Sequence, residues 1–237
     1  MLLKSMTWVD AETYLRGDDR VIVPLGACEE HGRHLPFAVD TIIAEEMAAA
    51  VGERAQVLVL PALAFGVSTP LMAFPGTIDI RPATWIALLS DVVRSLYRHG
   101  VRRVMLLNAH AGNFSPINCA MMTALDELPG LRVKLYSWYL EPEISAILRE
   151  ALGGPDAHAA AAETALMLAL QPETVRVRDG RAAPLRSVLA LNSPQQFREL
   201  YPNGAVGMDP GLASPELGRR LFDKAVDLCV QQVRTWE

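Results

Sequence analysis

The stretch that decides the fold is VIVPLGACEEHGRHLPFAVDTIIAEEMAAAV, residues 21–51. It begins with a continuous apolar run, which is typical of a strand in a parallel sheet that helices cover on both faces. A polar segment with two glutamates and two histidines follows, and apolar residues then recur at helical spacing from Ile42 to Val51. The stretch therefore predicts a strand, a functional loop and a helix, with Asp40 in a position where it could be the N-cap.

The rest of the chain continues this alternation of strands and helices. Apolar runs predict further strands over residues 57–63, 103–107 and 131–138. Helical patterns cover residues 7–16, 81–99, 115–128, 143–152, 156–170 and 214–236, whereas residues 172–215 have the composition of a loop. The order predicts one domain over residues 1–237, a three-layer α/β/α sandwich with a largely parallel central sheet.

Composition excludes several classes of function. The chain has 237 residues, 51% of them hydrophobic, which is enough for one domain with a large core. Its net charge is -5 and it has no basic run, so we expect no nucleic-acid partner and no membrane partner. No apolar stretch approaches the roughly 20 residues that a membrane span requires. The three cysteines, Cys28, Cys119 and Cys229, are few and far apart, which favours reduced thiols and a cytoplasmic, soluble protein.

Histidine is scarce in this chain and concentrated. There are five histidines, and His31 and His34 lie within four residues of each other. Glu29 and His31 are two residues apart, so in an extended segment they project to the same side, as two ligands of one metal must. His110 lies in NAHAGN, directly after another predicted strand, where open α/β sheets place their sites. An apolar residue would pack there at a lower desolvation cost, which favours a functional histidine.

Two further candidates lie later in the chain. Glu163 stands in a run of alanines, leucines and a methionine, where an unpaired carboxylate is costly unless it meets a cation. His158 precedes it by five residues, or about 140° on an ideal helix, so both face one site only if His158 lies before the helix or in its first turn. The candidate metal ligands are thus Glu29, His31, Asp40, His110 and Glu163, a histidine and carboxylate set suited to Zn, Mn or Fe in a hydrolytic site.

Simpler interpretations compete with these roles. Asp40 is equally well explained as a helix cap, and Glu163 as part of an exposed helix face. His31 and His34 could be polar loop residues, and His99 at a helix end most simply interacts with the helix dipole. Other catalytic frameworks are absent from the sequence: it has no dinucleotide fingerprint, no Walker-type loop and no GxSxG nucleophile elbow.

Taken together, these blocks resemble the creatininase (creatinine amidohydrolase) family. The family's Glu-x-His-Gly-x-His-Leu-Pro-x3-Asp block reads EEHGRHLPFAVD over residues 29–40, its Asn-Gly-His-Gly-Gly-Asn-like block reads NAHAGN over 108–113, and its late His-x4-Glu-Thr reads HAAAAET over 158–164. FPGT at 74–77 is also similar to a family loop. The resemblance implies a metal-dependent hydrolase of cyclic or linear amides, commonly a hexamer built as a trimer of dimers.

The resemblance also implies roles for individual residues. Glu29, His31, Asp40 and His110 fall on metal-ligand positions, with Asp40 as the bridge, and His158 falls on the proton-shuttling histidine. Creatinine-hydrolysing members carry a glutamate two residues after the central histidine, where this chain has Gly112. Our hypothesis is that Glu163 fills that gap.

A second departure concerns the substrate. The true creatininases carry a tryptophan shortly before the late histidine, whereas GGPDAH has none, although Trp138 is similar to a second substrate-side tryptophan. The sequence prediction is therefore an amidohydrolase that cleaves a C–N bond in a small cyclic amide or formamide by a metal-activated water. His158 and Glu163 are its catalytic candidates, and one or two ions of Zn and/or Mn, with Fe as a further option, its cofactors. The alternatives are a true creatininase and a non-catalytic protein that binds a small ligand.

Overall fold

Four parallel strands form the centre of the molecule. The computed structural model describes residues 1–154, 156–176, 182–185 and 192–236. The strands are β1 (Arg20–Leu25), β2 (Leu58–Val59), β3 (Arg103–Asn108) and β4 (Arg132–Tyr136), in the order β2-β1-β3-β4. Val21 pairs with Leu58 on one side and with Val104 on the other, which gives β1 a central place. The predicted parallel sheet is confirmed.

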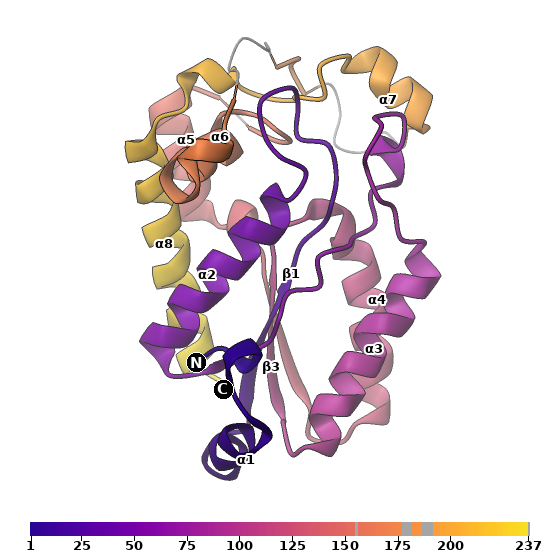
Figure 1. Ribbon diagram of the computed structural model, residues 1–237, viewed down its shortest axis with the longest axis vertical. Coiled ribbons are helices and arrows are strands. Elements are labelled where there is room, and N and C mark those ends of the chain that lie inside the picture. The colour runs from indigo at the N-terminus through magenta and orange to yellow at the C-terminus, as the bar shows by residue number, and fades with distance from the viewer. Residues whose placement is uncertain (155, 177–181, 186–191, 237) are drawn as a thin grey trace.

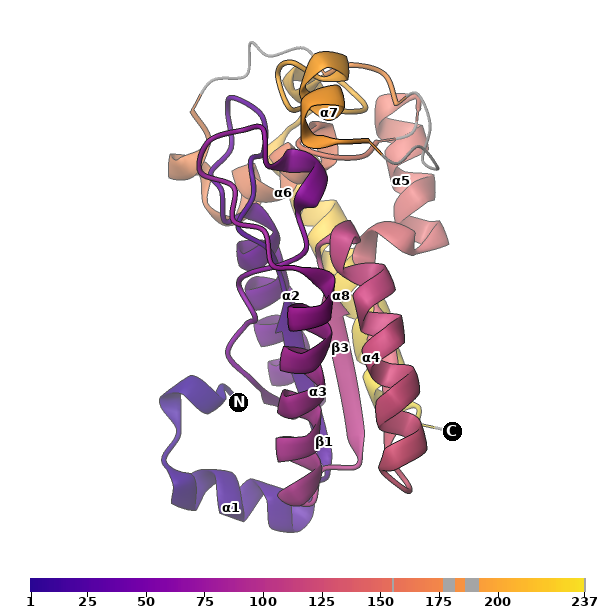
Figure 2. The same cartoon turned by 90° about the vertical axis from the view of Figure 1, so that its right-hand side faces the viewer.

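Helices cover both faces of this sheet, as Figures 1 and 2 show. One layer contains α2 (Val39–Ala55), α5 (Pro142–Leu152), α6 (Ala161–Leu170) and α8 (Pro215–Arg234), and the other contains α3 (Pro82–Arg98) and α4 (Phe114–Glu127). Two smaller helices, α1 (Trp8–Gly17) and α7 (Pro194–Leu200), lie near opposite ends of the molecule (Figure 1). The three-layer α/β/α prediction is confirmed.

The side chains of β1 explain why the strand reads as continuously apolar. Ile22 packs in the core beneath α2 and α8, whereas Val21 and Val23 pack with Trp85 in the core beneath α3 and α4. Successive residues of a strand point to opposite faces, so a strand buried on both faces needs no polar residue. Because β1 and β3 are parallel neighbours, their carboxyl ends emerge from the core at the same edge of the sheet.

Three sequence predictions about elements were wrong in extent. The helix predicted over residues 156–170 begins only at Ala161. The strand predicted over residues 57–63 is regular only at Leu58–Val59, although Leu60 and Leu63 still donate backbone hydrogen bonds to β1. Residues 172–215, predicted as loop, contain α7, which begins at a capping box formed by Ser193 and Gln196. Among the described residues, no helix is long and apolar enough to cross a membrane.

Candidate metal centre

Five separate segments bring polar side chains to the carboxyl edge of the sheet. The loop after β1 supplies Glu29 and His31, the first turn of α2 supplies Asp40, the loop after β3 supplies His110, the segment before α6 supplies His158, and the first turn of α6 supplies Glu163. All of them except His158 are buried, so the suggestion that Glu163 belongs to an exposed helix face is wrong. His158 precedes α6, as a shared site with Glu163 requires.

Asp40 lies between two histidines and does not cap α2. The helix begins at Val39, its N-cap is Ala38, and no side chain caps it, so the N-cap interpretation of Asp40 is wrong. One oxygen of Asp40, Oδ1, is 3.3 Å from Nε2 of His31, and the other, Oδ2, is 3.1 Å from Nδ1 of His110. A carboxylate with one oxygen toward each histidine has the arrangement of a bridge between two cations.

The candidate ligands form two trios that share Asp40. In the Glu29 trio, which is Glu29, Asp40 and His110, Nδ1 of His110 is 3.3 Å from Oε1 of Glu29. In the Glu163 trio, which is His31, Asp40 and Glu163, Nε2 of His31 is 3.8 Å from Oε2 of Glu163. Within each trio the ligand atoms lie within 4.8 Å of one another, close enough for one ion to contact all three.

Hydrogen bonds to backbone carbonyls orient both histidines of these trios. Nδ1 of His31 lies 3.1 Å from the carbonyl oxygen of Glu29, and Nε2 of His110 lies 2.9 Å from that of Val67. A carbonyl only accepts, so each of these nitrogens carries the hydrogen, and the opposite nitrogen of each neutral ring is left to bind a cation. Such outer hydrogen bonds are the usual support of metal-binding histidines.

The pKa values of the buried histidines and carboxylates show that the site favours positive charge next to its carboxylates. Burial lowers the pKa of His31, but Asp40 and Glu163 outweigh it and raise that pKa to about 10. Burial raises the pKa of Glu163 to about 7, against the opposing effect of His31. The pKa of Asp40 stays below its usual range in spite of burial, because His31 and His110 stabilise its charge. Protons on the histidines supply positive charge that a metal ion would supply in their place.

The polar atoms left without partners test whether a cation fits. Among the described residues, five buried side-chain polar atoms have no hydrogen-bond partner: one each in Ser68 and Trp138, and the three atoms Glu29 Oε2, His31 Nε2 and Asp40 Oδ2. Unpaired buried polar atoms are rare in native proteins because each loses its hydration without compensation. The three atoms belong to the two trios, and nitrogen and carboxylate oxygen are the ligands that zinc and manganese accept. The residues present therefore fit a divalent cation.

Gly112 leaves no room for a ligand after His110. A Cβ at this position would lie 2.1 Å from the carbonyl oxygen of Val67 and 2.5 Å from Nε2 of His110. Any side chain would disrupt the hydrogen bond that orients His110. The carboxylate of Glu163 is instead held beside Asp40, where the backbone N–H of Ala159 donates to its Oε2 at 2.6 Å.

Two contacts, one partly buried and one buried, involve residues to which sequence reasoning gave no role, Glu30 and His34. Nε2 of His158 lies 2.9 Å from the carbonyl oxygen of Glu30 and 3.2 Å from its carboxylate Oε1. Nε2 of His34 lies 2.8 Å from the hydroxyl of Thr164. Glu30 projects to the opposite side of an extended segment from Glu29 and His31, so the spacing that selected those two residues did not select Glu30. The only signal was the pair of adjacent glutamates.

A cavity of about 370 Å³ opens onto these side chains. Its lining includes His110, His158 and Glu163 together with Trp138 and Tyr139. A second cavity, of about 390 Å³, shares Trp138 and Tyr139 with the first and extends along α5.

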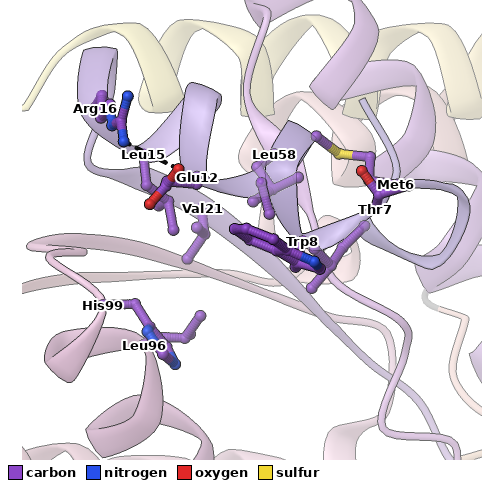
Figure 3. Close-up of a pocket in the computed structure, with 12 residues that line it drawn as sticks. Met6, Thr7, Trp8, Glu12, Leu15, Arg16, Val21, Leu58, Leu96 and His99 are labelled. Atoms are coloured by element: carbon purple, nitrogen blue, oxygen red, sulfur yellow. Dashed lines mark ion pairs between the residues drawn. The ribbon is translucent and has the colours of Figure 1, made fainter.

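A larger cavity, of about 780 Å³, lies elsewhere, between α1 and the end of α3. Figure 3 shows Trp8 on one side of it and Leu96 and His99 on the other. A third metal-capable group, of Glu29, His31 and His158, overlaps the two trios, and none of the three groups found among the described residues lies at this cavity. Cavity size therefore does not identify the site.

A shared aspartate with histidine and carboxylate trios, at the carboxyl edge of a parallel sheet, defines the class of metal-dependent hydrolases. The sequence profile "Creatininase: Creatinine amidohydrolase" matches residues 4–233, and the chain belongs to this family of hydrolases that act on C–N bonds. The recognition made from the motifs is confirmed.

Curated relatives and solved structures agree with this membership. The mycofactocin precursor peptide peptidase of Mycobacterium ulcerans (strain Agy99) is 32% identical over 228 residues, covering 91% of this chain and 85% of the relative. The creatinine amidohydrolase of Pseudomonas putida is 32% identical over 187 residues, covering 72% of each. A creatininase in a form named Mn superposes with a TM-score of 0.84 at 28% identity, over 98% of this chain and 97% of that one. A mutant creatininase of Zn-Zn type gives the same TM-score and identity, over 98% and 96%.

Proposed function

We propose that this chain hydrolyses the C–N bond of a small cyclic amide or formamide at a centre of two divalent cations. The observation that carries the proposal is the convergence of three buried, unpartnered ligand atoms on the two trios. A non-catalytic binding protein would gain nothing from holding such atoms without partners, since each costs stability.

The two trios assign the ligands. Glu29, Asp40 and His110 would hold one cation, and His31, Asp40 and Glu163 the other, with Asp40 as the bridge. Zn and Mn are the preferred ions and Fe is a further option, because the donor set holds no thiolate and solved relatives are named for Zn and Mn. Bound there, a divalent cation lowers the pKa of a water molecule and polarises the scissile carbonyl.

The chain's own residues would manage the proton and the substrate. His158 lines the cavity and would pass a proton to the leaving nitrogen as general acid. Trp138 and Tyr139 form the cavity wall that would exclude water from the substrate. Glu163 is the second catalytic candidate, since its carboxylate borders the same cavity and burial favours its protonated form.

The test is a substrate screen with matched variants. Zinc- and manganese-loaded protein is assayed against cyclic amides, formamides and lactones, and its metal content is measured. We expect about two ions per chain and turnover of at least one amide class. The His31→Ala, Asp40→Ala double variant should lose both, and His158→Ala should keep its metal and lose most turnover. The proposal would be rejected if the protein folds fully but binds neither zinc nor manganese and hydrolyses none of the substrates after incubation with either metal.

Peptide hydrolysis is the second candidate, because the second cavity extends the site beyond what a creatinine-sized molecule needs. Short peptides therefore join the screen. Creatinine is included as a direct test of true creatininase activity, against which Gly112 and the lack of a tryptophan before His158 argue.

We also infer a homo-oligomer in the cytoplasm, a hexamer by analogy with the family. The apolar side chains of Phe114, Met122 and Leu125 on α4 are exposed in the single chain, which supports contact with other copies. Light scattering of the purified protein tests the assembly: a mass near that of one chain, 25.9 kDa, would reject it.

A further inference from the structure

We propose that Glu30 is the positioning residue of His158: its backbone carbonyl and its carboxylate both accept from Nε2 of the ring and leave Nδ1 to face the reaction. This inference rests on the proposed function for its catalytic meaning, but the geometry behind it stands independently. Glu30 is buried and belongs to neither metal trio, so metal binding does not account for it.

Both acceptors that Glu30 offers lie on one nitrogen of the His158 ring. Nε2 is 2.9 Å from the carbonyl oxygen of Glu30 and 3.2 Å from its carboxylate Oε1. Neither group can donate when the carboxylate is ionised, so the hydrogen must be on Nε2. The other nitrogen, Nδ1, is 3.6 Å from Oε1 of Glu29 and thus faces the Glu29 trio.

Glu30 is itself held by three contacts, two of them on its carboxylate and one on its backbone N–H. Its Oε2 accepts a hydrogen bond from the backbone N–H of Gly32 at 2.9 Å, and its own backbone N–H donates to the hydroxyl of Thr77 at 3.1 Å. A Cβ on Gly204 would lie 2.0 Å from Oε2, so the backbone near Gly204 packs directly on the carboxylate. Thr77 belongs to the FPGT segment, which the metal trios leave without a role. Segments remote in sequence thus meet on this one side chain.

This arrangement suits a histidine that carries a proton during hydrolysis. Water adds to the carbonyl carbon, the C–O bond forms and the C–N bond breaks, and one proton of the water ends on the leaving nitrogen. His158 would take that proton on Nδ1 and pass it on, becoming an imidazolium for part of the cycle. A carboxylate on the far nitrogen keeps the ring in the right tautomer and compensates this charge. Without it, an imidazolium at this partly buried position is costly.

The kinetic test separates positioning from mere structural support. Metal-loaded Glu30→Ala and Glu30→Gln are compared with wild type on 4-methoxyformanilide, whose leaving nitrogen needs a proton, and on 4-nitroformanilide, which needs it less. For Glu30→Ala we expect kcat to fall about 10- to 100-fold on the first and less than about 3-fold on the second, with KM and metal content unchanged. Glu30→Gln keeps an acceptor oxygen and should recover part of the loss.

The double variant and a remote control complete the kinetic arm. Glu30 acts through His158, so Glu30→Ala should add less than about 2-fold to the loss caused by His158→Ala. Glu141→Gln changes a partly buried carboxylate that accepts a hydrogen bond from Gln232 and does not line the cavity, so it should leave both rates unchanged. Equal losses on both anilides, or losses that multiply in the double variant, would overturn the role of Glu30.

A readout without turnover keeps this inference distinct from the proposed function. Nitrogen-15 NMR of histidine-labelled, zinc-loaded protein, with the resonance assigned through His158→Gln, locates the ring proton. We expect it on Nε2 in wild type and in Glu30→Gln. In Glu30→Ala the backbone carbonyl of residue 30 still accepts from Nε2, so we expect the proton to stay on Nε2, with a changed Nε2 shift because the carboxylate contact is lost and with proton exchange at least about 10-fold faster. Identical spectra for wild type and Glu30→Ala would overturn the inference, even if none of the amides were hydrolysed.

Discussion

At the scale of single residues, the site depends on which atom of each side chain is already engaged in a hydrogen bond and which is left to bind a cation. The carbonyl oxygens of Glu29 and Val67 each hold one nitrogen of a histidine and thereby leave the opposite nitrogen toward Asp40. Asp40 in turn directs one oxygen to each ring. None of these commitments follows from spacing in the sequence, because they are made by backbone groups of segments that meet only in the fold. The sequence identifies the candidate ligands but not which of their atoms are available.

The first prediction concerns Gly112→Ala. The new Cβ would collide with the carbonyl of Val67 and with Nε2 of His110, so the His110 ring must move. We expect zinc affinity, measured by competition with a chelator, to fall about 10- to 100-fold, as when an outer partner of a metal ligand is lost. Gly17→Ala is the matched control, since no atom lies within 4 Å of its added Cβ. Unchanged affinity in Gly112→Ala would mean that the Val67 carbonyl does not orient His110.

The second prediction concerns the pH dependence of stability without metal. Burial raises the pKa of Glu163 from 4.5 to about 7. Between these values the unfolded chain releases a proton that the folded chain keeps, so stability falls as pH rises. From pH 5 to 6.5 this amounts to about 2 kcal/mol. The pKa of His31 is raised from 6.5 to about 10. The stability that this shift adds is fully present below pH 6.5 and is lost as the pH rises from there toward 10, so it changes little in the range from pH 5 to 6.5.

Urea unfolding of chelator-treated protein at pH 5.0 and 6.5 measures this difference. Glu163→Gln cannot ionise and should lose most of the decline, while other groups still contribute equally to both proteins. A decline of equal size in the variant would exclude Glu163 as its source.

At the scale of elements, the alternation of apolar runs predicted the layers, because strands buried on both faces and amphipathic helices differ plainly in period. The ends of elements were harder to predict. Asp40 has the residue type of an N-cap, but α2 begins at Val39, one residue earlier, so that Asp40 faces the histidines. The capping box at Ser193 was readable, yet the surrounding polar residues made α7 look like loop. In both cases the residue types alone did not determine where the helix begins.

The third prediction concerns the contact between the β1 loop and α6. Thr164 donates its hydroxyl hydrogen to the carbonyl of Ala160 at 2.7 Å and accepts from Nε2 of His34 at 2.8 Å. This contact links the loop that carries His31 to the helix that carries Glu163. Thr164→Val should therefore weaken the Glu163 trio and spare the Glu29 trio. Elemental analysis should show metal content falling from about two ions per chain to about one.

A matched threonine tests whether the loss is specific. Thr13→Val on α1 removes the same kind of hydroxyl bond, to the carbonyl four residues earlier, at an exposed position. It should leave the metal content unchanged. Loss of both ions from Thr164→Val would show that the two trios cannot be loaded separately.

At the scale of the whole molecule, the candidate centre joins parts of the fold that otherwise meet through separate cores. Glu29 and His110 leave strands that lie between the two cores, whereas Asp40 and Glu163 belong to α2 and α6, which pack in one core with α8. Cations at the trios would connect these parts directly. Such ions bind the folded chain in preference to the unfolded one, so their binding adds to its stability.

The fourth prediction follows from this connection. Treatment of zinc-loaded protein with a chelator should lower the thermal midpoint, and at free zinc about 100 times the Kd the loss of stability should be about 2.7 kcal/mol for each ion bound. Asp40→Asn removes the shared charge from both trios, so zinc should stabilise this variant much less. Asp227→Asn is the control: Asp227 pairs with Arg54 at the surface, and its replacement should leave the zinc effect intact. If zinc stabilised Asp40→Asn as strongly as wild type, the ions would bind elsewhere, and Asp40 would not be the bridge between the two halves of the site.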